Sequence, residues 1–202
     1  MTNLFNFMDG SDGLAGGMAV LGFGAYAIAA NAGGAVWLAT VCVAVAAASF
    51  AFLLFNFHPA KIFMGDSGSI PLGFLAGAVG VAGWQAGVWA LWFPLLVFSP
   101  FVVDATLTLA KRLFHREKVW QAHREHYYQR LVRMGLGHRK TALAGYLLML
   151  ACATVALGAR NSSPILEVFL LVVSAACYAG LALWIDSLWA RHKLKCPAEN
   201  AQ

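Results

Sequence analysis

The sequence is poor in charged residues. Only 11% of its 202 residues are Asp, Glu, Lys or Arg, whereas about a quarter of the residues are charged in a typical soluble domain. At the same time, 60% of the residues are hydrophobic and the mean hydropathy is +0.69. This combination excludes an ordinary soluble globular domain and indicates a chain that lies largely in lipid.

Cysteine is also scarce, and this bears on two kinds of site. The four cysteines show no metal-like pairing, and three lie in apolar stretches, so we interpret them as packing residues and not as a disulfide framework. The histidines lack third and fourth ligands at suitable spacing, which argues against zinc. A basic and then apolar leader is missing as well, and we expect the first apolar stretch to serve as the insertion signal.

Long apolar stretches remain between the polar loops, and each is long enough to cross a membrane as a helix. We therefore predict an all-α, polytopic membrane protein, with a single membrane domain over 1–186 and a cytosolic tail over 187–202. Pro100 should kink or break the fourth helix, and Asp104 beyond it should face a polar cavity or partner. The third stretch is rich in glycine, which suits close helix packing, and a re-entrant hairpin is the alternative there. The six predicted spans are 14–31, 35–56, 70–86, 88–110, 141–158 and 164–185.

Basic residues lie almost entirely in alternate loops. If the N-terminus is inside, 13 of the 14 Lys and Arg residues fall on the inner side and only Arg160 falls outside. Because positive charge is retained in the cytoplasm during insertion, we predict that both termini are cytoplasmic, with cytosolic loops at 1–13, 57–69 and 111–140. This asymmetry accounts for the pI of 9.2 and suits membrane lipid headgroups and phosphorylated ligands. We do not expect nucleic acid as a partner.

Carboxylates and amides gather just before the first apolar stretch, at Asn3, Asn6, Asp9 and Asp12. The two Asp residues are three apart, so they share a face on a helix and can still converge in a turn. Such oxygens could bind hydroxyls, base edges or a divalent ion. A solvated N-terminus in which Asp12 caps a helix explains the same residues equally well.

A second polar cluster lies between the second and third apolar stretches. The Gly-Asp-Ser-Gly motif at 65–68 lets backbone N–H groups turn toward an anion, Asp66 could hold a metal against phosphate oxygens, and Lys61 could add positive charge. Ser69 followed by Pro71 is typical of a helix start, so we place the helix from about residue 70, with Pro71 in its first turn. The alternative is a well-capped tight turn, which the motif in isolation slightly favours.

The third cluster lies in the long loop after the fourth apolar stretch. His123 and His126 are spaced for one face of a helix, and Arg124 and Arg130 offer planar guanidinium groups suited to phosphate. A basic helix that lies on the headgroups is an equally good interpretation.

Taken in this order, the three segments resemble the polyprenyl-phosphate N-acetylhexosamine-1-phosphate transferase family. The resemblance rests on N-x-x-N-F-x-D-G-x-D-G-L-A at the first cluster and P-A-x-x-F-M-G-D-S-G-S at the second. The stretch R-E-H-Y-Y-Q-R-L looks most like the branch that initiates O-antigen. Members transfer a sugar-1-phosphate from a UDP-N-acetylhexosamine to undecaprenyl phosphate in the bacterial inner membrane, releasing UMP.

The resemblance also implies roles for the matched positions. Asp66 would bind magnesium, with manganese as an alternative, on the pyrophosphate. The catalytic set would be Asp66, Asp9, Asp12 and His126. The remaining substrate contacts would be Asn6 at the nucleotide, Asn56 and Phe63 at the uridine, and Lys61, Gly65, Ser67, Gly68, His123 and Arg124 at the phosphates.

Two departures from the family pattern matter. Where many members carry several close histidines, His126 is followed here by Tyr, Tyr and Gln. The family normally has about ten spans and an Asp-Asp pair in its first half, and this chain has no such pair. We therefore expect the chain to correspond to the C-terminal half of the family fold and to be inactive on its own.

Other functions remain open at this point. A non-catalytic membrane fragment, or a subunit that binds lipid or a partner, is the main alternative to an enzyme. A transporter ranks below both, because the polar clusters lie at span ends and transport sites usually lie mid-membrane. The sequence leaves a homodimer open as well.

Overall fold

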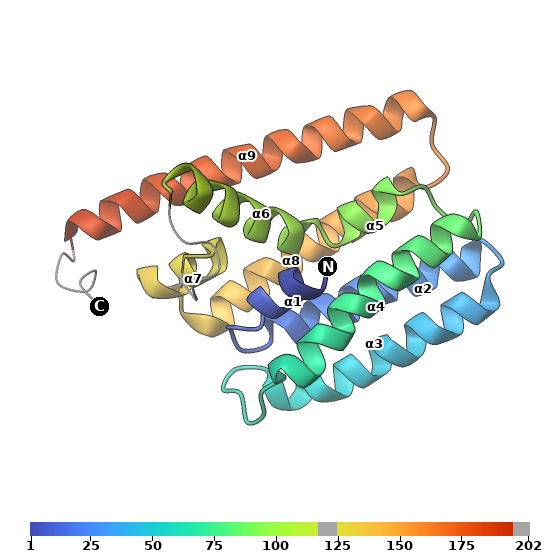
Figure 1. Ribbon diagram of the computed structural model, residues 1–202, viewed down its shortest axis with the longest axis horizontal. Coiled ribbons are helices and arrows are strands. Elements are labelled where there is room, and N and C mark those ends of the chain that lie inside the picture. The colour runs from blue at the N-terminus through green and yellow to red at the C-terminus, as the bar shows by residue number, and fades with distance from the viewer. Residues whose placement is uncertain (117–124, 196–202) are drawn as a thin grey trace.

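The computed structural model describes residues 1–116 and 125–195, and every regular element in those residues is a helix (Figure 1). This confirms the prediction of an all-α, polytopic protein. The elements are α1 (Thr2–Phe7), α2 (Leu14–Ala32), α3 (Val36–Asn56), α4 (Gly65–Gln85), α5 (Trp92–Val97), α6 (Ser99–Phe114), α7 (Tyr127–Leu131), the π-helix η1 (Val132–Leu136), α8 (Gly137–Ala159) and α9 (Pro164–Lys195).

Within the described residues, five helical segments are long and apolar enough to cross a membrane: α2, α3, α4, the run from α7 through α8, and α9. The predicted fourth span at 88–110 is not a single helix. It divides at Phe98 into α5 and α6, and Pro100 lies in the first turn of α6. Proline lacks the N–H that would continue a helix and its ring clashes with the preceding turn, so the expected break at Pro100 is confirmed.

The predicted start of α4 near residue 70 is wrong, because the helix begins at Gly65. Asp66 lies in its first turn, where a carboxylate interacts favourably with the helix dipole. The Ser69 hydroxyl oxygen lies 3.0 Å from the Gly65 carbonyl oxygen, one helical turn earlier. The 65–69 segment is therefore the first turn of a 21-residue helix, Pro71 lies inside that helix, and a re-entrant hairpin is excluded.

The end of α9 also differs from the prediction. We placed the last span at 164–185, but the helix continues to Lys195, so most of the predicted tail is helical. The added residues contain no Gly or Pro, and their basic side chains at Arg191 and Lys193 suit the negative end of the helix dipole.

Small residues allow the central helices to approach closely. The helix α2 is the most enclosed of the candidate spans, because 72% of its most apolar 18-residue stretch is buried. A Cβ at Gly73 of α4 would lie 2.7 Å from the Thr2 Cα, and one at Gly83 would lie 2.0 Å from the Trp89 ring. Glycine is thus required where α1 and the α4–α5 connection pack on α4, as the glycine-rich sequence predicted.

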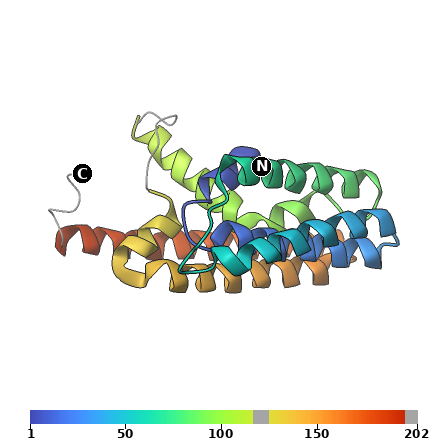
Figure 2. The same cartoon turned by 90° about the horizontal axis from the view of Figure 1, so that it is seen from below.

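The polar segments collect at one end of the helix bundle. Residues 57–64 and 125–136 lie in the left half of Figure 1, with α1 beside them near the middle, and the turns around 33–35, 86–91 and 160–163 lie at the opposite end. The view from below shows the same division (Figure 2). We call the end formed by 1–13, 57–64 and 125–136 the loop end.

Candidate active site

The first two motifs are hydrogen-bonded to each other at the loop end. The Ser69 hydroxyl of α4 donates to Asn6 Oδ1 (2.7 Å). The Gly65 backbone N–H donates to Asp9 Oδ2 (3.0 Å). Residues 56 or more positions apart in the chain are therefore joined, and the first two motifs converge at the loop end.

Asp12 is bound to the loop between α3 and α4. His58 Nδ1 donates to Asp12 Oδ2 (2.7 Å), and the Ala60 N–H donates to the same oxygen (3.2 Å). Burial tends to raise the pKa of Asp12, but these hydrogen bonds and the nearby His138 outweigh burial, so its pKa lies below the ordinary 3.8. Asp12 is therefore held as a carboxylate by the protein itself.

Asp9 lies in a different electrostatic environment. Burial raises the pKa of its carboxyl from 3.8 to about 6; the Gly65 N–H opposes the rise and the negative charge of Asp66 adds to it. The Asp66 carboxylate is thus close enough to disfavour ionisation of Asp9. Such a pair is stabilised by any cation that binds between them.

Several predicted site residues are exposed beside these carboxylates. Asp66, Ser67 and Lys61 are exposed, and Phe63 has 77% of its surface accessible. Gly68 is half-buried on the same helical turn. The aromatic ring of Phe63 is therefore free to stack on a planar ligand.

Asn56 is used differently from the prediction. Its side chain is 3% exposed, its Oδ1 accepts from the Gly13 N–H (2.9 Å), and its Nδ2 donates to the Ile62 carbonyl oxygen (2.9 Å). Both ends of the amide are thus engaged in joining the two motif loops. The structure gives Asn56 a structural role, and contact with uridine stays a prediction that these hydrogen bonds do not favour.

His126 is buried at the start of α7. It is 2% exposed, and its ring lies between Phe7 (5.8 Å between ring centroids) and Tyr128 (6.0 Å). Its Nδ1 lies 3.2 Å from Asp104 Oδ1, and its side chain also caps the start of α7. His126 therefore joins α7 to α1, and its phosphate contact stays a prediction. His123 and Arg124, which the resemblance assigned to the phosphates, lie outside the described residues.

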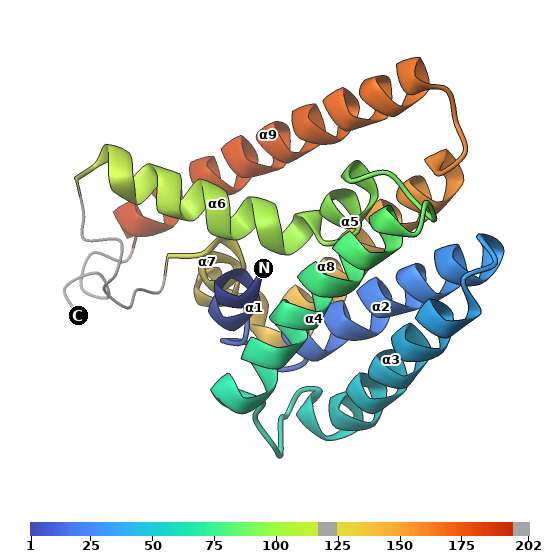
Figure 3. The same ribbon diagram turned by 45° about the vertical axis from the view of Figure 1, so that its right-hand side comes forward.

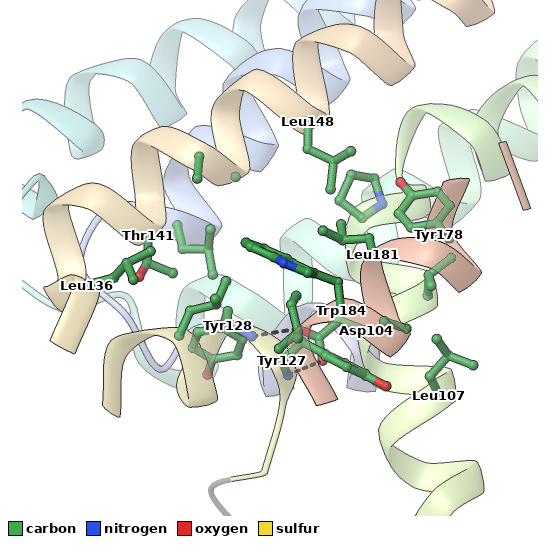
Figure 4. A pocket seen from close by; sticks show the side chains of 18 of the residues that line it. Asp104, Leu107, Tyr127, Tyr128, Leu136, Thr141, Leu148, Tyr178, Leu181 and Trp184 are labelled. Carbon is green, nitrogen blue, oxygen red and sulfur yellow. Dashed lines mark hydrogen bonds between the residues drawn. The ribbon is translucent and has the colours of Figure 1, made fainter. Parts of the chain in front are cut away.

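Asp104 has the polar partner that its position in an apolar stretch requires. Its two carboxylate oxygens accept from the backbone N–H groups of Tyr127 (2.9 Å) and Tyr128 (3.1 Å) (Figure 4). The Tyr128 hydroxyl in turn donates to the Phe7 carbonyl oxygen (3.0 Å). Through these bonds α6 positions α7 against the first motif, and the expectation that Asp104 faces a polar partner is confirmed.

Two groups of residues were missed by the sequence reasoning. Beside Asp12, the rings of His58 and His138 stack (5.9 Å between centroids), and Ser11 Oγ lies 3.0 Å from His138 Nδ1. No pattern predicted this pair, because the two histidines are 80 positions apart.

The second missed group surrounds Asp186 of α9. It pairs with Lys111 and with Arg130 (2.8 Å), and the Tyr127 hydroxyl lies 3.4 Å from it. These bonds join α6, α7 and α9. Asp186 therefore has a structural role at the loop end.

Comparisons with known proteins identify relatives of this sequence. A family model described as glycosyl transferase family 4 matches residues 1–84, which contain α1 to α4 and the first two motifs. A Bacillus subtilis protein named probable undecaprenyl-phosphate N-acetylglucosaminyl 1-phosphate transferase is 31% identical over 175 residues, covering 86% of this chain and 49% of that protein.

Shorter matches come from a second group of enzymes. The phospho-N-acetylmuramoyl-pentapeptide-transferase of Geobacillus thermodenitrificans is 51% identical over 80 residues, covering 40% of this chain and 25% of that protein. The protein of the same name from Shouchella clausii is 45% identical over 80 residues, with the same coverage. The chain thus spans about half the length of the Bacillus subtilis relative and a quarter of the other two. On the motifs, the fold and these matches, the chain belongs to glycosyl transferase family 4.

Proposed function

We propose that this chain carries the nucleotide-sugar site of an enzyme that transfers N-acetylhexosamine-1-phosphate from a UDP-sugar to undecaprenyl phosphate. The observation that carries the proposal is the convergence at the loop end. The first motif is bonded to the start of α4 through Asp9 and to α7 through the Phe7 carbonyl. The names of the relatives support the same class of reaction.

The proposed reaction exchanges one phosphorus–oxygen bond for another. An oxygen of the lipid phosphate bonds to the phosphorus that carries the sugar, the bond from that phosphorus to the bridging oxygen breaks, and the electron pair leaves with UMP. The protein has little covalent chemistry to perform, so its residues act by positioning and by neutralising charge. Lys61 would balance the diphosphate charge and Phe63 would stack on uracil.

The first turn of α4 would supply the remaining phosphate contacts. The Gly65 N–H already donates to Asp9, and the N–H groups of Asp66, Ser67 and Gly68 lie at the positive end of the helix dipole. Such N–H groups have no partner within the helix and commonly bind phosphate. This position beside the exposed Asp66 is where a metal-bound diphosphate would lie.

The carboxylates suit a magnesium ion better than a metal that takes all of its ligands from protein side chains. Among residues 1–116 and 125–195, no group of three or more His, Cys, Asp or Glu side chains is arranged to hold a metal. Asp9 and Asp66 provide two hard oxygen donors on an open face. Mg²⁺ is commonly held by one or two carboxylates together with phosphate oxygens and water, and Mn²⁺ accepts the same donors. When bound, the ion would neutralise negative charge on the diphosphate.

The site would face the cytoplasm of the bacterial inner membrane. In the sequence, 13 of the 14 Lys and Arg residues fall in the inner loops and tail predicted above, whereas Arg160 lies in the turn opposite the loop end, and this asymmetry favours a cytoplasmic loop end. The R-E-H-Y-Y-Q-R-L stretch favours a role in initiating a cell-envelope polysaccharide of the O-antigen type.

Binding of UMP to the purified chain in lipid nanodiscs tests the site without requiring turnover. Wild-type protein should bind UMP in the presence of Mg²⁺ and lose most of that affinity in EDTA. Asp66→Asn should remove the dependence on Mg²⁺. Glu167→Gln is the matched control, because Glu167 also lies in the first turn of a long helix but at the opposite end of the bundle.

Two results would count against the proposal. UMP binding that is equally strong in EDTA would contradict a metal-bound diphosphate. No UMP binding by wild-type protein, even when it is co-expressed with the N-terminal half of a family member, would favour a non-catalytic membrane subunit. Transfer of radiolabelled sugar to undecaprenyl phosphate by the co-expressed halves would establish the reaction itself.

A further inference from the structure

A large apolar pocket lies between the last helices of the chain, apart from the carboxylates of the candidate site. Its volume is about 840 Å³, within the usual range for ligand pockets. Side chains of α6, α8 and α9 line it, including Leu107, Leu148, Leu181 and Trp184 (Figure 4). Asp9, Asp12 and Asp66 do not line it.

The pocket exists because α9 stands away from the rest of the bundle. Only 6% of the most apolar 18-residue stretch of α9 is buried. In Figure 3 the helix is separated from α2, α3 and α4 by other helices of the bundle. Polar bonds hold α9 at two levels. The Tyr178 hydroxyl bonds with Ser99 (2.7 Å) and contacts Cys152 Sγ (3.2 Å), and Asp186 pairs with Lys111 and Arg130.

The length of the pocket matches one leaflet of a bilayer. Tyr178 and His192, which both line the pocket, are 14 residues apart on α9, a rise of about 21 Å. Half of a bilayer, counted with its headgroups, is also roughly 20 Å thick. A lipid chain beside α9 would therefore reach Tyr178 from a headgroup at the level of His192.

The pocket also contains a buried hydroxyl, that of Thr141, which has no hydrogen-bond partner in the part of the chain that the structure describes and could donate to a polar group of the lipid. Thr141 lines the pocket, is 3% exposed, and its Oγ1 has no hydrogen-bond partner among the described residues. It lies in the second turn of α8, near the loop end. A buried hydroxyl that lacks a partner costs free energy, and an ester carbonyl oxygen at this depth would satisfy it. Glycerophospholipids carry such esters, whereas the chain of a polyprenyl phosphate does not.

Basic side chains lie at the same end of the pocket. Arg191 is exposed and His192 is half-buried with its ring stacked on Trp189 (5.5 Å between centroids). Both line the pocket. The Asp104 carboxylate also lines it, but its oxygens accept from the backbone of α7. The pocket thus joins an apolar interior to a positive mouth, the distribution expected for an anionic lipid.

We propose that this pocket binds one acyl chain of an anionic glycerophospholipid. The chain fills the space between α8 and α9, its ester carbonyl accepts from the Thr141 hydroxyl, and its phosphate lies at Arg191 and His192. The second acyl chain lies on the lipid-facing side of α9. This lipid site is separate from the nucleotide site, so the failure of one proposal leaves the other standing.

Native mass spectrometry of the purified chain, with phosphatidylglycerol and phosphatidylcholine as competing probes, tests the proposal. Wild-type protein should retain one phosphatidylglycerol in preference to phosphatidylcholine. Ala182→Phe places a ring in the pocket and should lower retention at least tenfold. Ala179→Phe is the matched control, since Ala179 lies on the exposed side of the same helix. Equal thermal unfolding of the two variants shows that the loss is not a folding defect.

Two further comparisons test separately where the lipid headgroup binds and whether the ester carbonyl accepts a hydrogen bond. Arg191→Gln should remove the preference for phosphatidylglycerol, whereas Lys193→Gln, an equal change of charge off the pocket lining, should keep it. A diether phosphatidylglycerol lacks the carbonyl and should bind wild-type protein about three- to tenfold more weakly than the diester. Thr141→Val should bind the two lipids equally.

Three results would overturn the proposal. Equal lipid retention by Ala182→Phe and Ala179→Phe would place the lipid elsewhere. If Arg191→Gln kept the preference for phosphatidylglycerol over phosphatidylcholine, the proposed phosphate position at Arg191 would be excluded. Displacement of phosphatidylglycerol by an equimolar amount of undecaprenyl phosphate would assign the pocket to the polyprenyl substrate instead.

Discussion

Replacing Asp9 by Asn should stabilise the chain above pH 6 and leave its stability unchanged near pH 4. The pKa of Asp9 is raised from 3.8 to about 6 by burial and by the charge of Asp66. Between these two pH values the folded chain holds a proton that the unfolded chain has lost, so the stability of wild-type protein falls as the pH rises through this interval. Asn cannot ionise and avoids that loss, while its side-chain oxygen can still accept from the Gly65 N–H.

The size of the effect follows from the change in pKa. One pH unit corresponds to about 1.36 kcal/mol, so a change from 3.8 to about 6 sets a ceiling near 3 kcal/mol. Asp9 is only partly buried, and solvent screening reduces this to roughly 1–1.5 kcal/mol. For a chain of 202 residues, that is an increase in Tm of about 3–5 °C.

Thermal unfolding in detergent with EDTA, followed by circular dichroism from pH 4 to pH 8, measures this difference. Asp12→Asn provides a control of opposite sign. The pKa of Asp12 is lowered in the folded chain, so its carboxylate stabilises the fold above the unfolded pKa, and this contribution is lost as the pH falls through the folded pKa. Asp12→Asn should therefore destabilise the chain at pH 7.

A difference between wild type and Asp9→Asn that stays constant from pH 4 to pH 8 would refute the reasoning, because it would mean that Asp9 keeps its ordinary pKa. Mg²⁺ should shrink the difference at pH 7.5, since a cation between Asp9 and Asp66 favours both carboxylates. The Asp12→Asn variant should show no comparable response to Mg²⁺.

Three other substitutions separate structural residues from ligand contacts. Asn56→Ala should cost about 2–4 kcal/mol, because it leaves the buried Gly13 N–H and the partly buried Ile62 carbonyl without their partner. Asn31→Ala, at the exposed end of α2, should change stability by less than about 0.5 kcal/mol. Asp104→Asn should cost about 1–3 kcal/mol and make the segment around α7 more sensitive to proteolysis, because the carboxylate accepts from two α7 N–H groups; unchanged proteolysis would contradict this docking role. Phe63→Ala should leave Tm unchanged, since the ring is 77% exposed, but should weaken UMP binding by about 1–3 kcal/mol in calorimetry; unaltered affinity would exclude stacking on uracil.

Local patterns predicted most of the fold correctly. Helix boundaries went wrong where a local signal competed with a contact from elsewhere in the chain. Pro71 suggested a helix start near residue 70, yet α4 begins at Gly65, where the backbone is bonded to Asp9. The fourth span broke where Pro100 indicated, but its division into two helices at Phe98 required the packed structure.

The site residues divide in the same way. The predicted topology correctly put the first two motifs on one side of the protein, and the structure joins Asp9 and Asn6 to the start of α4. The sequence could not tell which matched residues are free for a ligand, because that depends on partners far away in the chain. Asn56 and His126 both fit the family pattern. Both side chains are buried, and their hydrogen bonds join segments that are distant in the chain.

The sequence alone determined the membrane class, the helical architecture and the family. These follow from the length of apolar stretches, because backbone groups in lipid must be satisfied within helices, and from motifs that are contiguous in the chain. Only the tertiary structure decided how the polar groups are used. It alone showed that Asp9 and Asp66 share a face, that Asp104 supports α7, and that α9 stands off to leave a lipid-sized pocket. Those features depend on side chains from separate helices, and the hydrophobicity of each helix carries no information about which polar group lies opposite.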